Sequence, residues 1–170
     1  MRQVRKNNYL CIFFAILLSI YLICKINDHV IEHYNMQDPL LNKIINKCKP
    51  LFTTEYYNPD MLGVLSPLNK RNILNEISIM RGDNSYTINK KKVYICMKNE
   101  NGEYYTENML TYVLLHELAH VICDEVGHTP KFHQIFEKLL ERAVVLDIYN
   151  NSQELIFNYC KKGDPEMKRI

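Results

Sequence analysis

The stretch VLLHELAHVICDEVGHTPKFH, residues Val113–His133, decides how the rest of this 170-residue sequence is interpreted. It contains the pattern H-E-x-x-H, formed by His116, Glu117 and His120. An α-helix turns by about 100° per residue, so side chains four positions apart lie one turn apart on the same face. The two imidazoles can therefore bind one Zn²⁺ ion, and Glu117 can accept a proton from a water molecule that the metal activates. This arrangement is typical of metalloproteases.

The sequence contains a second histidine motif, with which the first can be compared. Residues 29–33, HVIEH, form the inverted motif H-x-x-E-H. They follow an apolar run and have no further ligand-type residue nearby, whereas the H-E-x-x-H motif lies in a long apolar segment and is followed by more histidines. We therefore interpret Val113–His133 as the metal site, and His29 and His33 as part of a solvated stalk.

A catalytic zinc ion takes three protein ligands and keeps one position open for water. The candidates for the third ligand are Glu125, His128, His133 and Glu137. His128 falls at the break between two predicted helices, where the chain reverses and can return an imidazole to the metal. His133 lies in the first turn of the second helix and remains an alternative, as do the two carboxylates. The predicted ligand set is His116, His120 and His128.

Composition limits the class of protein. Apolar residues make up 47% of the chain, enough for the core of one compact domain. The formal net charge of +2 does not indicate a strong nucleic-acid binder. Of the six cysteines, those in the body of the chain are Cys48, Cys96, Cys123 and Cys160. Their wide spacing permits disulfides but specifies no pairing.

Residues 9–26 are apolar almost throughout, and about 18 such residues are long enough to cross a bilayer. Basic residues precede this run at Arg2, Arg5 and Lys6, and acidic residues follow it at Asp28 and Glu32. The positive-inside rule then predicts a single-pass membrane protein with a cytosolic N-terminus and the body on the far side. A cleaved signal peptide is the alternative, but no small-x-small cleavage site follows the run.

These features predict four segments: a basic segment 1–8, a transmembrane signal anchor 9–26, a stalk 27–37 and a metallopeptidase domain 38–170. Asp38-Pro39 is a helix start, and apolar residues at helical spacing continue to Cys48. We expect a loop over residues 51–67, while residues 68–80 fit either a helix or a strand.

The rest of the domain is predicted to be mixed α and β. Ser85–Ile88 and Val93–Met97 are β-prone runs around three turn lysines, which we interpret as a hairpin with a solvated tip. The site helix is capped by Thr106 or Asn108 and ends at Gly127, and Thr129-Pro130 starts the next helix.

The motif HELAH, followed by Gly127-His128-Thr129-Pro130-Lys131-Phe132, resembles the H-E-x-x-H … H-x-P-x-F pattern of WLM and SprT-like zinc metallopeptidases. The resemblance covers about residues 84–143. It implies a small zincin-like α+β fold, with a short sheet or hairpin packed on the site helix. It also implies zinc on His116, His120 and His128, with Glu117 as the general base.

The resemblance further implies that an extended peptide lies along the hairpin strand before the site helix. The residues of that strand are Val93, Tyr94, Ile95, Cys96 and Met97. Similar small domains occur in large DNA viruses, so the membrane would be a viral or a host one. Known members act on DNA–protein crosslinks, which leaves nucleic acid open as a partner, yet this chain has no basic DNA-binding tail.

Three functions are therefore weighed. The first is a membrane-anchored zinc endopeptidase that acts on polypeptides with Glu117 as general base. The candidates for oxyanion stabilisation are Tyr104, Tyr105, Tyr149 and His133. The second is a protease for DNA–protein crosslinks. The third is a non-enzymatic membrane protein whose structural zinc is closed by a fourth ligand, His133.

Overall fold

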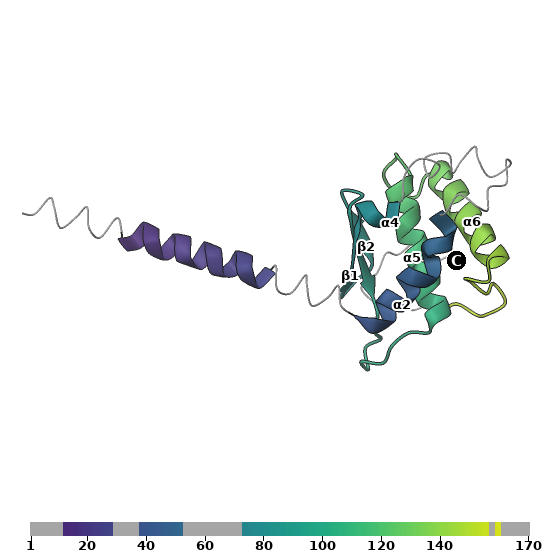
Figure 1. Ribbon diagram of the computed structural model, residues 1–170, viewed down its shortest axis with the longest axis horizontal. Coiled ribbons are helices and arrows are strands. Elements are labelled where there is room, and N and C mark those ends of the chain that lie inside the picture. Colours follow the sequence, from purple (N-terminus) through teal and green to yellow (C-terminus); the bar gives the residue numbers. More distant parts are fainter. Residues whose placement is uncertain (1–11, 29–37, 53–72, 157–158, 161–170) are drawn as a thin grey trace, which may run out of the picture. The chain divides into compact units, whose positions relative to one another are not determined.

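The computed structural model describes residues 12–28, 38–52, 73–156 and 159–160 (Figure 1). The chain divides into two compact units, Met1–Asn35 and Met36–Ile170. In the first unit, residues 12–28 form a helix. The predicted basic segment 1–8 and the inverted motif at 29–33 lie outside the described residues, as does most of the predicted stalk 27–37.

The prediction of a transmembrane anchor at residues 9–26, and with it of a single-pass membrane protein, is wrong. Over the ranges that the structure describes, no helix combines the length and the apolar character needed to cross a membrane. A crossing helix needs about 20 predominantly apolar residues. The described helix covers only residues 12–28, and its last turn contains Lys25 and Asp28.

The second unit contains a three-stranded sheet with the strand order β1-β3-β2. The strands are β1 (Ser78–Gly82), β2 (Tyr86–Ile88) and β3 (Lys92–Cys96). β2 and β3 pair antiparallel, which confirms the predicted hairpin. Its turn contains Asn89 and Lys90, both in the left-handed region with φ of 50° and 55°, as a tight hairpin turn requires.

The central position of β3 changes the prediction for the peptide-binding strand. β1 pairs with β3 in parallel, from Ser78 opposite Lys92 to Gly82 opposite Cys96. The strand predicted as an edge, Val93–Met97, therefore has β1 on one side and β2 on the other. For residues 68–80 the sequence fitted either a helix or a strand, and the described part, from residue 73, contains both: a helical turn over Ile73–Glu76 and the start of β1 at Ser78. Among the described strands, β1 and β2 are the two edges of this sheet.

The first helix of this unit starts as predicted. α2 (Pro39–Cys48) is capped by Asp38, whose carboxylate accepts hydrogen bonds from the backbone N–H groups of Leu40 and Leu41 at 3.0 and 3.1 Å. A 3₁₀ turn, η1 (Lys49–Phe52), follows directly. Most of the predicted loop 51–67 lies outside the described residues. α4 (Ile73–Glu76) is a single turn before β1.

Two longer helices carry the histidine motif and its continuation. α5 (Glu107–Ile122) is capped by Thr106, and α6 (Pro130–Val145) by Thr129, as predicted. The predicted end of the site helix at Gly127 is wrong, because Cys123 is already extended. Gly127 does adopt a left-handed φ of 84°, but it does so in the loop between the two helices.

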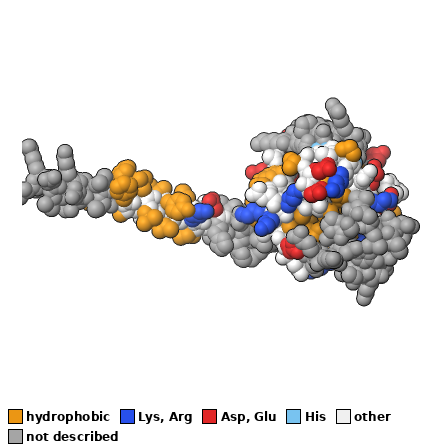
Figure 2. Space-filling view, turned by 90° about the horizontal axis from the view of Figure 1, so that it is seen from above, with side chains coloured by type: hydrophobic (Ala, Val, Ile, Leu, Met, Phe, Trp, Pro, Cys, Tyr) orange, Lys and Arg blue, Asp and Glu red, His pale blue; other side chains and the backbone are white. Residues whose placement is uncertain are grey.

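α5 forms the centre of the second unit, in contact with the sheet, α2 and α6 (Figure 1). All residues from Thr111 to Ala119 are buried, including His116 and Glu117. A helix buried on every side needs an apolar sequence, which explains why this segment is so uniformly hydrophobic. The prediction of a mixed α+β domain is confirmed at this level. On the face shown in Figure 2, acidic and basic side chains are interspersed.

Candidate metal centre

The structure brings three histidine side chains together at the C-terminal half of α5. The Nε2 atom of His128 lies 3.0 Å from that of His116 and 3.1 Å from that of His120. Three nitrogen ligands of a tetrahedral zinc, each at 2.0–2.1 Å, would be about 3.3 Å apart. The ligand atoms of these residues all lie within 4.8 Å of one another, so the group can bind a metal ion.

The protonation state of His116 suits a metal. Burial, followed by the charges of the neighbouring imidazoles, lowers the pKa of His116 from 6.5 to about 3. His116 is therefore neutral at physiological pH, and a neutral imidazole nitrogen offers a lone pair to a metal ion. Its Nδ1 has no hydrogen-bond partner among the described residues, so its Nε2, facing His128, is the atom placed for coordination.

Phe132 packs against all three imidazoles. This fully buried ring stacks on His120 at a centroid distance of 4.3 Å and meets His128 and His116 edge to face at 4.7 and 5.0 Å. It stands in the first turn of α6, which Thr129 caps through the backbone N–H of Phe132. The sequence showed Phe132 as part of the motif that follows His128 but gave no sign that it contacts all three rings.

A lysine in the turn of the β2–β3 hairpin binds the loop that carries His128. The Lys90 ammonium donates hydrogen bonds to the backbone carbonyls of Cys123 and, at 3.4 Å, Glu125. Cys123 is the C-cap of α5, where unpaired carbonyls and the negative end of the helix dipole favour a cation. Lys90 was expected to be a solvated turn residue, and in the structure it joins the turn to the site loop.

Glu117 is buried beside the histidines, with 2% of its surface exposed. The Thr87 hydroxyl lies 2.8 Å from Oε2 of Glu117 and 3.2 Å from its backbone carbonyl oxygen. An open cavity of about 710 Å³ adjoins the carboxylate. The cavity is lined by β2 and its turn, by Glu117 and His120, and by the loop residues 125–127.

The remaining candidates lie elsewhere. His133 is exposed, its ring centroid is 6.3 Å from that of His128, and it is not part of the three-histidine group. Glu125 and Glu137 are exposed and are not part of it either. The Tyr104 hydroxyl donates to Asp38, the Tyr105 hydroxyl accepts from the backbone of Cys160, and Tyr149 packs on Tyr112.

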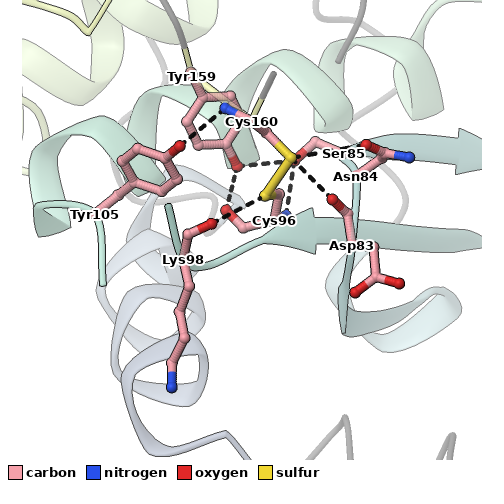
Figure 3. Close-up of a disulfide and its surroundings, with 8 residues drawn as sticks. All are labelled: Asp83, Asn84, Ser85, Cys96, Lys98, Tyr105, Tyr159 and Cys160. Carbon is pink, nitrogen blue, oxygen red and sulfur yellow. Dashed lines mark hydrogen bonds between the residues drawn. A yellow bond between two sulfur atoms is a disulfide. The ribbon is translucent and has the colours of Figure 1, made fainter. Parts of the chain in front are cut away.

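The structure contains a disulfide that the sequence did not predict (Figure 3). Cys96, at the end of β3, is joined to Cys160 in the C-terminal segment. The neighbouring Tyr159 hydroxyl bonds to the Ser85 hydroxyl at 2.9 Å and donates to the carbonyl of Cys96. Burial raises the pKa of the Tyr159 hydroxyl. A pairing across 64 residues leaves no local sequence signal.

Comparison with known proteins finds viral relatives. The chain is 48% identical over 101 residues to "Uncharacterized protein 136R" of invertebrate iridescent virus 6, which covers 58% of this chain and 57% of that protein. It is 39% identical over 109 residues to "Uncharacterized protein 042R" of invertebrate iridescent virus 3, covering 62% and 69%. A third relative, "Uncharacterized protein R325" of Acanthamoeba polyphaga mimivirus, is 39% identical over 69 residues. No family model and no solved structure matches.

Proposed function

The chain belongs to the same family as protein 042R of invertebrate iridescent virus 3. We propose that this chain is a zinc-dependent endopeptidase with a WLM or SprT-like zincin fold. The observation that carries the proposal is the convergence of three imidazole nitrogens beside the buried Glu117. Two of these imidazoles, and Glu117 itself, belong to α5, and the third belongs to the loop that follows it. Nitrogen ligands suit Zn²⁺, and three of them leave the fourth position that a catalytic site needs.

In the proposed mechanism, the histidines of this chain would bind the metal and Glu117 would act as the general base. His116, His120 and His128 hold the zinc ion, which when bound lowers the pKa of water and polarises the scissile carbonyl. Glu117 accepts the proton of the attacking water through its carboxylate and then passes it to the leaving amine. Its burial beside the cavity supports this role, because a carboxylate away from bulk water keeps a fixed orientation.

The substrate we propose is an extended polypeptide added to the sheet at β2. β2 is one of the two edge strands of the described sheet, and of these two it is the one that lines the cavity beside Glu117 and His120. Main-chain hydrogen bonds to an edge strand bind a peptide with little dependence on its sequence. This assignment replaces Val93–Met97, because residues 93–96 belong to β3, the central strand of the sheet.

A structural zinc site is less well supported. It would need a fourth protein ligand, for which His133 was the candidate, and His133 is exposed and outside the group. A buried Glu117 would also have no role in a closed site. The crosslink-protease alternative differs only in substrate, and stimulation of cleavage by DNA at low salt would favour it.

The first test measures zinc in the purified full chain for wild type, His128→Ala and His133→Ala. We expect about one zinc per chain in wild type and in His133→Ala, and loss of zinc in His128→Ala. Equal loss in both variants would indicate a closed four-histidine site. A folded wild type that takes up no zinc would contradict the proposal.

The second test replaces the general base. Glu117→Gln keeps the shape of the side chain but cannot accept the proton, so we expect zinc binding to persist and cleavage of a fluorogenic peptide library to fall by about 10²–10⁴-fold. Wild-type protein and His133→Ala serve as active controls. Retained activity in Glu117→Gln would remove Glu117 from the mechanism.

A further inference from the structure

Thr87 points toward the site because side chains along β2 alternate between the two faces of the sheet. Its neighbours Tyr86 and Ile88 are exposed, so the strand turns residue 87 toward α5. Its register partner is Val93, which is fully buried on that side of the sheet. The hydroxyl thereby lies 2.8 Å from Oε2 of Glu117.

We propose that Thr87 is a positioning residue for the general base, an inference that rests on the proposed peptidase function. A hydroxyl that donates to one carboxylate oxygen fixes the plane of the carboxylate that is to accept the proton of the attacking water. A hydrogen bond to a charged acceptor is shorter and stronger than a neutral one, which suits this task. The second contact, 3.2 Å to the Glu117 carbonyl oxygen, places Thr87 against the helix backbone as well.

The hydroxyl is itself held in place. Threonine is branched at Cβ, so its χ1 angle has few alternatives in a strand. β2 is fixed on one side by its pairing with β3, and its turn is joined to the site loop through Lys90. Thr87 therefore transmits the position of the edge strand, where the peptide would lie, to the carboxylate that performs the chemistry.

The test compares Thr87→Val, which keeps the shape and removes the donor, with Thr87→Ser, which keeps the donor. Thr111→Val is the matched control, because Thr111 is a buried threonine of α5 whose hydroxyl donates to the Glu107 carbonyl at 2.7 Å. The assay uses the zinc-loaded full chain and one quenched fluorescent peptide that the wild type cleaves. We expect kcat of Thr87→Val to fall by about 10- to 100-fold, with KM and zinc content unchanged.

Rescue separates positioning from packing. We expect Thr87→Ser to recover most of the wild-type kcat and Thr111→Val to stay close to it. A wild-type kcat in Thr87→Val, or an equal loss in Thr87→Val and Thr87→Ser, would overturn this inference while leaving the peptidase intact. Absence of cleavage by the zinc-loaded wild type would overturn the peptidase function and this inference together.

Discussion

Phe132 shows how a single apolar side chain can control a polar site. Its ring contacts the imidazoles of His116, His120 and His128, so it determines where their nitrogens meet. Residues around a metal site orient its ligands, and the loss of outer-shell hydrogen-bond partners that do so typically weakens metal affinity by about 10- to 100-fold.

We therefore expect Phe132→Leu to weaken zinc binding by about tenfold or more, measured by competition with a chromophoric chelator. The lost packing should also lower the free energy of unfolding by about 1–3 kcal/mol, measured in urea. Phe136→Leu is the control, since Phe136 is also a buried phenylalanine of α6. Of the three site imidazoles, its ring contacts that of His116, at a centroid distance of 5.2 Å. Equal zinc affinities for the two variants would show that Phe132 acts only as a core residue.

At the scale of elements, the β2–β3 hairpin supports the site through its turn. Lys90 donates to carbonyls at the end of α5 and in the loop leading to His128. A cation at a helix C-terminus is typically worth 0.3–1 kcal/mol.

Lys90→Met keeps the aliphatic part of the side chain and removes the charge and the donor. We expect it to lower the free energy of unfolding by about 1 kcal/mol and to weaken zinc binding several-fold, because the loop bearing His128 is released. Lys91→Met, one position on and exposed, should change neither quantity. The same zinc affinity in both variants, measured by chelator competition, would contradict this role for Lys90.

The elements also show what the sequence could and could not predict. The helix starts at Asp38 and Thr129 followed from local capping patterns, and the spacing of the histidine motif followed from helical geometry. The central place of β3 in the sheet could not be predicted, because it depends on the parallel pairing of β3 with β1, which no local pattern encodes. The contact between Thr87 and Glu117 was missed for the same reason, since it joins residues 30 positions apart.

At the scale of the whole molecule, the Cys96–Cys160 disulfide joins the C-terminal segment to the strand at the centre of the sheet (Figure 3). Closing a span of 64 residues restricts the unfolded chain and is typically worth about 2–4 kcal/mol. The remaining body cysteines, Cys48 and Cys123, are free and buried. Burial raises the pKa of the Cys48 thiol to about 12, which leaves it protonated and unreactive.

The buried histidine makes the stability of the metal-free protein depend on pH. In the folded chain His116 has a pKa of about 3, against 6.5 for an ordinary histidine. Between these values the unfolded chain binds a proton at this position that the folded chain does not, so acid favours unfolding. We expect chelator-treated protein to lose up to about 1.4 kcal/mol per pH unit from this residue as the pH falls from 6.5 toward 3.

His116→Gln removes the titrating group and so isolates this contribution from that of the carboxylates. Urea unfolding at several pH values should give a shallower loss of stability in acid for His116→Gln than for wild type, with the difference confined to pH values below about 6.5. Identical pH dependence in the two proteins would mean that His116 takes up its proton over the same pH range in the folded and in the unfolded chain. Burial would then not disfavour the charged form of this imidazole, which would contradict its lowered pKa of about 3.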